Sequence, residues 1–277
     1  MQGEPEQKTV TVGGAKIRYA EAGEGAPVIM LHGGGPGAWG LSNYRKNVPA
    51  FARKFRVIVP DFPGFGGSER LPVTAGLFVM LADMILGLMD ALSIPKASIV
   101  GNSLGGGTAL RMTLKAPERI ERLVLMGPAG SIPVYTPMPT EGLLRMMTYY
   151  TGEGPTLEKL RKVIDLLVFD PSTITEDLLK ERFQSSATPE AIANPPLKAF
   201  GAHPSDQIWR DNIAGIRQRS LIIWGREDRV VPLDCAFLLL KAMPNAELHI
   251  FPNCGHWAQW EKADQFNALV TDFLDQP

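Results

Sequence analysis

Cysteine is scarce in this chain of 277 residues, which has only Cys235 and Cys254. Two thiols with no secretory signal before them do not make a disulfide framework, which argues against a small disulfide-stabilised secreted domain. A strong charge of one sign is also missing, because 28 Lys and Arg stand against 29 Asp and Glu. With a net charge of −1 the chain has no overall positive potential to attract nucleic acid or an anionic membrane, so we expect neither as a partner.

The chain also lacks a long uninterrupted hydrophobic run. Its most apolar stretch, residues 71–92, contains Pro72, Asp83 and Asp90 and therefore predicts a packed helix, not a membrane span. Residues 1–8 are polar and carry acids, unlike a signal peptide, so we expect a cytoplasmic location. What remains is ordinary globular composition at a length that suits one large α/β domain with an insertion.

Short apolar runs alternate with helix-like segments, which is typical of a mainly parallel sheet covered by helices. Runs of Val, Ile and Leu this short suit strands that are buried on both faces. The expected strands are residues 8–12, 16–20, 28–31, 56–59, 98–100, 123–126, 221–224 and 247–251. The expected helices between them are residues 76–92, 104–115, 233–243 and 263–274.

The middle of the chain differs, because residues 132–209 contain nine prolines and no convincing strand. Helical patches are expected at residues 141–150, 157–168 and 176–183. We therefore predict a core built from residues 1–131 and 210–277, with residues 132–209 forming a helical lid between two strands.

The sequence GNSLG at residues 101–105 fits the G-x-S-x-G nucleophile elbow, with Ser103 as the nucleophile. A sharp strand-to-helix turn requires small residues two before and two after the serine. The expected strand before it and helix after it favour this interpretation over the alternative, a glycine-rich helix start capped by a serine.

A nucleophilic serine needs a base, and the chain has only four histidines. In the α/β-hydrolase fold the order is Ser, acid, His. His256 follows the last expected strand, and ligands bind at the carboxyl ends of the strands in a parallel sheet. His256 is therefore our predicted base. Asp228, after the penultimate strand, is the predicted acid that orients the imidazole. Its neighbour Glu227 is the main alternative acid. The alternative role for Asp228 itself is a structural ion pair with Arg226 or Arg229 in the same loop.

The oxyanion of a tetrahedral intermediate needs backbone N–H donors. One is expected from Leu104, the residue after the nucleophile. The other is expected from Gly34 in the sequence HGGGPG at residues 32–37. A phosphate-binding loop is the alternative for these glycines, but no G-x-x-x-x-G-K-[ST] sequence is present.

These sequences together resemble the meta-cleavage product hydrolases, the carbon–carbon bond hydrolases of aromatic and steroid ring degradation. The resemblance spans nearly the whole chain. It is carried by HGGGPGA at 32–38, SNY at 42–44, GNSLGG at 101–106, LMGP at 125–128, WGREDR at 224–229 and CGHW at 254–257. The triad positions of the family match Ser103, Asp228 and His256.

The resemblance implies further substrate-binding positions. Asn43 and Asn102 are expected to line the substrate site, and Arg182 to meet the carboxylate and keto-enol end of the substrate. Trp257 is expected to pack beside it. The simpler alternatives are a helix cap for Asn43, a solvated helix residue for Arg182 and a core residue for Trp257. The flanking oxyanion-loop glycines that we also expect to contact the substrate are Gly33 and Gly35.

The resemblance implies hydrolysis of a 2-hydroxy-6-oxo-hexa-2,4-dienoate through a keto tautomer and an acyl-enzyme. The products would be 2-hydroxypenta-2,4-dienoate and a carboxylic acid, with no metal or organic cofactor. The chain would be a homo-oligomer, a dimer or larger. The alternative functions are a carboxylesterase or thioesterase on the same triad and, less favoured, a non-catalytic receptor for a small ligand.

Overall fold

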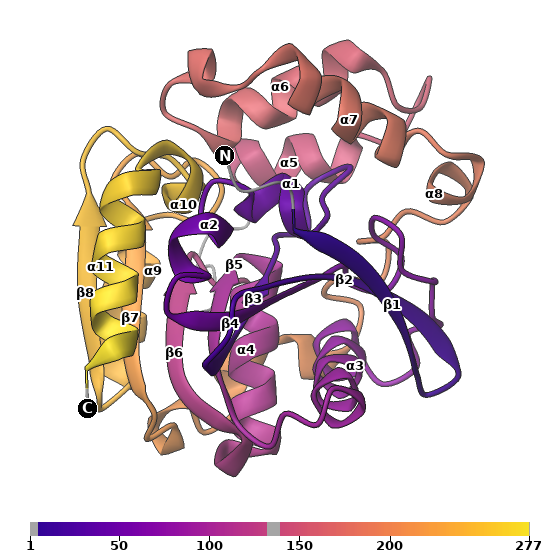
Figure 1. The fold of residues 1–277 in the computed structure, drawn as a ribbon. Helices are drawn as coiled ribbons and strands as arrows, with labels where there is room; N and C mark the ends of the chain where they lie inside the picture. The colour runs from indigo at the N-terminus through magenta and orange to yellow at the C-terminus, as the bar shows by residue number, and fades with distance from the viewer. Residues whose placement is uncertain (1–4, 132–138, 277) are drawn as a thin grey trace.

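The computed structural model describes residues 5–131 and 139–276, which build an eight-stranded sheet flanked by helices (Figure 1). Every expected strand is present, most of them one to three residues longer than the apolar run that predicts them. The strands are β1 (Glu6–Val12), β2 (Ala15–Ala22), β3 (Ala26–Leu31), β4 (Phe55–Pro60), β5 (Ala97–Asn102), β6 (Ile120–Met126), β7 (Arg219–Gly225) and β8 (Ala246–Phe251).

The order of the strands across the sheet is β1-β2-β4-β3-β5-β6-β7-β8. The strand β2 pairs antiparallel with β1 and β4, and all pairs from β4 to β8 are parallel. Gly13 and Gly14 adopt φ of +57° and +90° between β1 and β2, as a tight hairpin requires. The carboxyl ends of six parallel strands therefore face the same edge of the sheet, with β5 at their centre.

Helices cover both faces of the sheet, and two apolar clusters separate them. One cluster packs α3, α4 and α9 on one face, and the other packs α1, α2 and α11 on the opposite face. These helices are α1 (Gly40–Tyr44), α2 (Val48–Phe51), α3 (Leu77–Ala91), α4 (Leu104–Lys115), α9 (Asp234–Ala242) and α11 (Ala263–Asp275). The short helix α10 (Ala258–Glu261) precedes α11, and a 3₁₀ turn, η1 (Pro117–Arg119), precedes β6.

Between β6 and β7 the described chain forms helices and 3₁₀ turns but no strand. We call α5 to α8 the inserted helices, and in Figure 1 α5, α6 and α7 lie together at the top of the molecule, above the sheet. They are α5 (Glu141–Thr148), α6 (Leu157–Leu167), α7 (Glu176–Ser186) and α8 (Pro189–Ala193). The turns are η2 (Pro171–Thr173), η3 (Pro204–Asp206), η4 (Ile208–Arg210) and η5 (Ile213–Gly215).

The inserted helices have their own apolar cluster, which includes Leu160, Ile164 and Leu179. The expected start of the lid, residues 132–138, lies outside the described residues, so the division at residue 131 stays a prediction. None of the described helices has the length and apolar character that crossing a membrane would require.

Candidate active site

Ser103 occupies the sharp turn between β5 and α4, with φ at +53°. This backbone conformation is strained for a residue other than glycine. A Cβ atom at Gly101 would lie 2.5 Å from the Gly105 carbonyl oxygen, and one at Gly105 would lie 2.1 Å from the Leu31 carbonyl oxygen. The two glycines of the G-x-S-x-G sequence are therefore required by backbone contacts at this turn.

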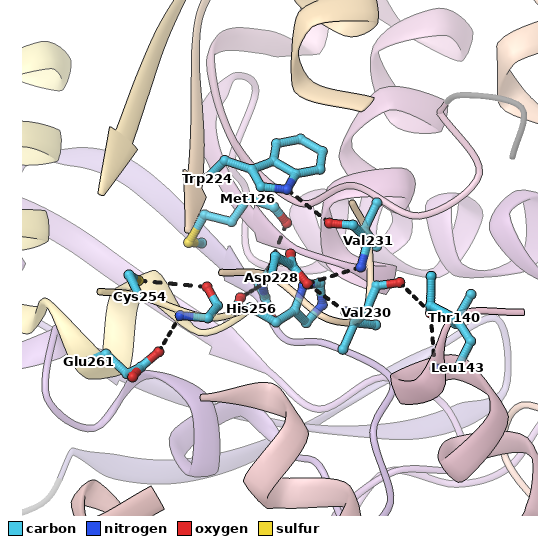
Figure 2. A network of polar contacts seen from close by, with 12 residues as sticks. Met126, Thr140, Leu143, Trp224, Asp228, Val230, Val231, Cys254, His256 and Glu261 are labelled. Carbon is cyan, nitrogen blue, oxygen red and sulfur yellow. Dashed lines mark hydrogen bonds and ion pairs between the residues drawn. The ribbon is translucent and has the colours of Figure 1, made fainter. Parts of the chain in front are cut away.

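The loops after β7 and β8 bring Asp228 and His256 together (Figure 2). The Nδ1 atom of His256 lies 2.7 Å from Oδ2 of Asp228. The other carboxylate oxygen of Asp228 accepts hydrogen bonds from the backbone N–H groups of Val230 and Val231, at 2.8 and 3.0 Å. Three hydrogen bonds thus hold the Asp228 carboxylate, and the carboxylate directs Nε2 of the imidazole away from itself.

The alternative acids have other partners. Glu227 accepts a hydrogen bond from the Cys254 N–H at 3.0 Å and pairs with Arg226. Asp61 accepts hydrogen bonds from the N–H groups of Gly40 and Gly67, both at 2.9 Å. Of Asp228, Glu227 and Asp61, only Asp228 contacts the His256 imidazole in the described structure.

Ser103 and His256 line one small cavity, but no hydrogen bond joins them in the described part of the chain. The Nε2 atom of His256 is buried and has no hydrogen-bond partner among the described residues. Catalytic hydrogen bonds are often long in an enzyme without substrate and shorten in the reacting complex. The arrangement leaves one imidazole nitrogen directed at the space beside the serine.

The glycine loop after β3 forms another wall of this cavity through Gly33, Gly34 and Gly35. Leu104 begins α4, so its N–H has no acceptor within the helix. Cδ2 of its side chain would lie 3.2 Å from a Cβ atom at Gly34, so the two residues expected to supply the oxyanion donors are neighbours. Any side chain at Gly34 would occupy that space.

His32 supports this loop from below, a role that the sequence did not suggest. Its Nε2 accepts a hydrogen bond from the Phe62 N–H at 3.0 Å, so Nδ1 carries the proton and donates to the Gly33 carbonyl at 2.7 Å. Burial lowers the pKa of the His32 imidazole to about 4. A neutral imidazole therefore fixes the first peptide of the oxyanion loop.

Arg182 of α7 is fully buried above the same cavity. Its Nε donates to the Pro36 carbonyl at 3.2 Å, and both terminal nitrogens have no hydrogen-bond partner among the described residues. The guanidinium carbon lies 4.8 Å from the centre of the Trp257 ring, and burial lowers the pKa of the guanidinium to about 9. A buried cation with unused donors is a site for an anion.

Two asparagine amides complete the polar lining. Neither the oxygen nor the nitrogen of the buried Asn43 side chain has a partner among the described residues. Asn102 donates to the His256 carbonyl at 3.2 Å and leaves its side-chain oxygen without a partner. Asn43 lies within α1, so it is not the helix cap that was its structural alternative. Nine of the eleven residues predicted for the site thus line one cavity. The other two are Leu104, which follows Ser103 in the chain, and Asp228, which contacts the His256 imidazole.

The apolar lining contains Met146 and Leu167. Met147 and Phe169, two further apolar residues between β6 and β7, are 70% and 48% exposed and do not line it.

Glu261 of α10 is a further residue that the sequence did not single out. One carboxylate oxygen accepts the N–H groups of Phe169 and Asp170 at 2.7 and 3.0 Å, and the other accepts the Gly255 N–H at 2.7 Å (Figure 2). Burial raises the pKa of this carboxyl. Glu261 therefore ties the end of α6 to the residue before His256.

The known proteins that are similar to this chain agree with one another in fold and in the kind of hydrolase they are. The family model described as the alpha/beta hydrolase fold matches residues 26–263. A 2-hydroxy-6-oxo-6-phenylhexa-2,4-dienoate hydrolase from Burkholderia cepacia is 44% identical over 262 residues, covering 94% of this chain and 91% of that protein. A 2-hydroxy-6-oxononadienedioate/2-hydroxy-6-oxononatrienedioate hydrolase from Comamonas testosteroni is 43% identical, with the same two coverages.

Solved structures agree with these relatives. The meta-cleavage product hydrolase CumD from Pseudomonas fluorescens IP01 superposes with a TM-score of 0.86 at 37% identity, covering 97% of each chain. The 2-hydroxy-6-oxo-6-phenylhexa-2,4-dienoate hydrolase from Rhodococcus sp. strain RHA1 gives a TM-score of 0.87 at 32% identity, covering 99% of each chain. Both the sequence and the backbone of this chain are thus similar to the same group of proteins.

Proposed function

Because this chain belongs to the meta-cleavage product hydrolases of the α/β-hydrolase fold, we propose that it hydrolyses a carbon–carbon bond in a 2-hydroxy-6-oxo-hexa-2,4-dienoate. The observation that carries this proposal is the buried Arg182 guanidinium, whose terminal nitrogens have no described partner, in the same cavity as Ser103. A plain esterase substrate has no anionic end to justify a buried cation, whereas a dienoate carboxylate supplies its counter-ion.

The first step is tautomerisation, because carbon is a poor leaving group until an electron sink adjoins the bond to be broken. The proton of the 2-hydroxyl is transferred to C5, and the 2-oxo group that forms becomes that sink. Arg182 neutralises the carboxylate beside the developing charge, and the free amide nitrogen of Asn43 donates to the oxygen at C2. The free side-chain oxygen of Asn102 accepts a hydrogen bond from the 2-hydroxyl before the proton leaves. His256 handles the proton.

The second step is attack of Ser103 on the C6 ketone. His256 takes the hydroxyl proton, Asp228 stabilises the imidazolium, and the N–H groups of Gly34 and Leu104 hold the oxyanion. Collapse breaks the C5–C6 bond, and its electron pair moves into the 2-oxo system to give 2-hydroxypenta-2,4-dienoate after protonation. Water activated by His256 then cleaves the acyl-enzyme and frees the carboxylic acid.

The test follows the loss of colour of a yellow 6-phenyl dienoate alongside release of nitrophenol from a neutral aryl ester. We expect efficient cleavage of the dienoate, and a loss of at least about a thousandfold in kcat for Ser103→Ala with binding retained. An enzyme that hydrolyses the ester and leaves the dienoate intact would instead be the carboxylesterase of the alternative interpretation.

We propose that the group at C6 of the substrate, on its acyl side, is apolar. Met146 and Leu167 line the cavity, and Arg182 is the only Lys or Arg among its described lining residues. A second carboxylate at the far end of the substrate would have no cation there. In a panel of dienoates that differ at C6, we expect kcat/KM to be higher for a phenyl or alkyl group than for a carboxyalkyl group. We further propose a cytoplasmic location and a homo-oligomer.

A further inference from the structure

A second cavity, of about 190 Å³, lies between the loop after β4 and the region of α7 and α8. One water needs about 15 Å³ of such space, so this cavity has room for a small organic molecule. None of the residues that line it also lines the catalytic cavity. Its polar and charged lining consists mainly of Ser68, Arg70, Tyr150, Ser185, Thr188 and Glu190.

Arg70 supplies a cation whose hydrogen bonds are long. Its side chain is 17% exposed, and its guanidinium meets Glu190 and the Gly64 carbonyl only at 3.4 Å in each case. By contrast, Arg45 holds both oxygens of Glu181 at 2.9 and 2.8 Å. The planar donors of Arg70 can therefore engage a further carboxylate with better geometry than their present partners give.

Two hydroxyl groups line the same cavity as the Arg70 guanidinium. In the described part of the chain, no hydrogen bond joins the side-chain hydroxyl of Tyr150 or Ser185 to another residue, and both residues line the cavity. Burial raises the pKa of Tyr150, so its hydroxyl keeps its proton and remains a donor. One guanidinium and two neutral hydroxyls are a suitable donor set for a carboxylate.

The second cavity is separated from the catalytic cavity by a thin partition. Gly37 forms part of its wall, and a Cβ atom at Gly37 would lie 1.9 Å from the Arg182 carbonyl oxygen. Pro196 lines the second cavity, while the next residue, Leu197, would lie 3.0 Å from a Cβ atom at Gly34 in the oxyanion loop. Residues 196 and 197 thus touch the walls of both cavities.

We propose that the second cavity is a docking site for a small conjugated monocarboxylate, where the carboxylate end of the substrate binds Arg70 before it reaches Arg182. This inference rests on the proposed function, because it assumes an anionic substrate. Glu190 opposes it electrostatically, but that side chain is 72% exposed and its charge is therefore screened.

Two single variants, Arg70→Gln and Glu190→Gln, test the proposal because it predicts opposite changes in their kinetics. We expect Arg70→Gln to lower kcat/KM for the dienoate about fivefold relative to the neutral aryl ester, and Glu190→Gln to raise the same ratio about twofold. Both variants break the same ion pair, so a purely structural role would move them in the same direction. Arg53→Gln, at an exposed position outside both cavities, removes the same charge and should leave the ratio unchanged. Equal changes for Arg70→Gln and Glu190→Gln would overturn the proposal.

Binding can be measured directly by isothermal titration calorimetry with hexa-2,4-dienoate (sorbate) as the probe. In an Arg182→Gln background, which removes the catalytic cation, we expect sorbate still to bind, and addition of Arg70→Gln to raise Kd at least tenfold. No binding to Arg182→Gln, or an equal Kd in both variants, would rule out a second site. Failure of the proposed function is seen separately, as a wild-type enzyme that does not cleave the dienoate.

Discussion

At the scale of single residues, the buried charge on Arg182 has the largest consequence for substrate choice. Its guanidinium is fully buried, stacks over Trp257 and has two nitrogens without a described partner. Removing one partner of a buried, hydrogen-bonded charge pair costs about 2–5 kcal/mol. The carboxylate of a bound dienoate would be that partner.

We therefore expect Arg182→Gln to lower kcat/KM for the dienoate by about a hundredfold, which corresponds to about 3 kcal/mol. The neutral aryl ester needs no cation, and its kcat/KM should fall far less. The measurement is the ratio of the two kcat/KM values, with the exposed Arg161→Gln on α6 as the matched control. Equal losses on both substrates would remove Arg182 from carboxylate binding.

His32 leads to a prediction about pH and stability. Its pKa is about 4 in the fold against about 6.5 for a free histidine, so between these limits the unfolded chain binds more protons than the folded one. The free energy of unfolding must then rise with pH in this window, and the contribution is lost as pH falls from 6.5 towards 4.

For a fully buried group, this contribution amounts to about 3 kcal/mol. Denaturant unfolding at several pH values should show a smaller loss between pH 7 and 4.5 in His32→Gln than in the wild type, because the amide does not titrate. An identical pH dependence in both proteins would assign the acid sensitivity to other groups.

At the scale of elements, the sequence predicted the strands and the helices of several turns, but it missed the helices of a single turn. The helices α3, α4 and α11 have twelve to fifteen residues, and their apolar periodicity located them to within one residue. The helices α1 and α10 have five and four residues and were missed, because one turn contains no repeat to detect. Yet these two short helices carry Asn43 and Glu261.

Glu261 couples two elements that are distant in sequence, and its effect can be measured. In Glu261→Gln, the amide nitrogen would face an N–H donor, so either the Gly255 bond or the pair from Phe169 and Asp170 is lost. We expect kcat to fall about tenfold on both the dienoate and the ester, because the imidazole of His256 serves both.

A merely structural defect would lower the thermal midpoint without this pattern, so the variant is compared at a temperature where it is fully folded. Glu158→Gln on the exposed face of α6 is the matched control and should keep wild-type kcat. A change confined to KM would contradict a role for Glu261 in holding the histidine loop.

At the scale of the whole molecule, chain order predicted most of the site. In a parallel sheet the loops after β3, β5, β7 and β8 must meet at one edge, so motifs far apart in sequence were expected to converge. The sequence could not predict the pairing of Glu227 with the Cys254 N–H, the support from His32 or the size of the cavity. These depend on packing distances that no local pattern encodes.

The size of the catalytic cavity has a consequence for motion. Its free space is about 10 Å³, no more than about one water needs and far too small for a dienoate. Leu167, Met146 and Arg182 close it from the inserted helices, whereas the elbow below is fixed by backbone contacts. We therefore expect the inserted helices to move away from the sheet when substrate binds.

Amide hydrogen exchange can detect this movement. In Ser103→Ala, which should bind the dienoate without cleaving it, we expect α6 and α7 to exchange faster than β5 and α4 when free, because local opening exposes them. Addition of the dienoate should slow exchange in α6 and α7 by about tenfold or more and leave β5 unchanged. The Arg45–Glu181 ion pair joins the end of α1 to α7, so Glu181→Gln should speed exchange in α7 of the free protein. Uniform exchange across α7 and β5, with no effect of ligand, would mean that substrate enters without displacement of the inserted helices.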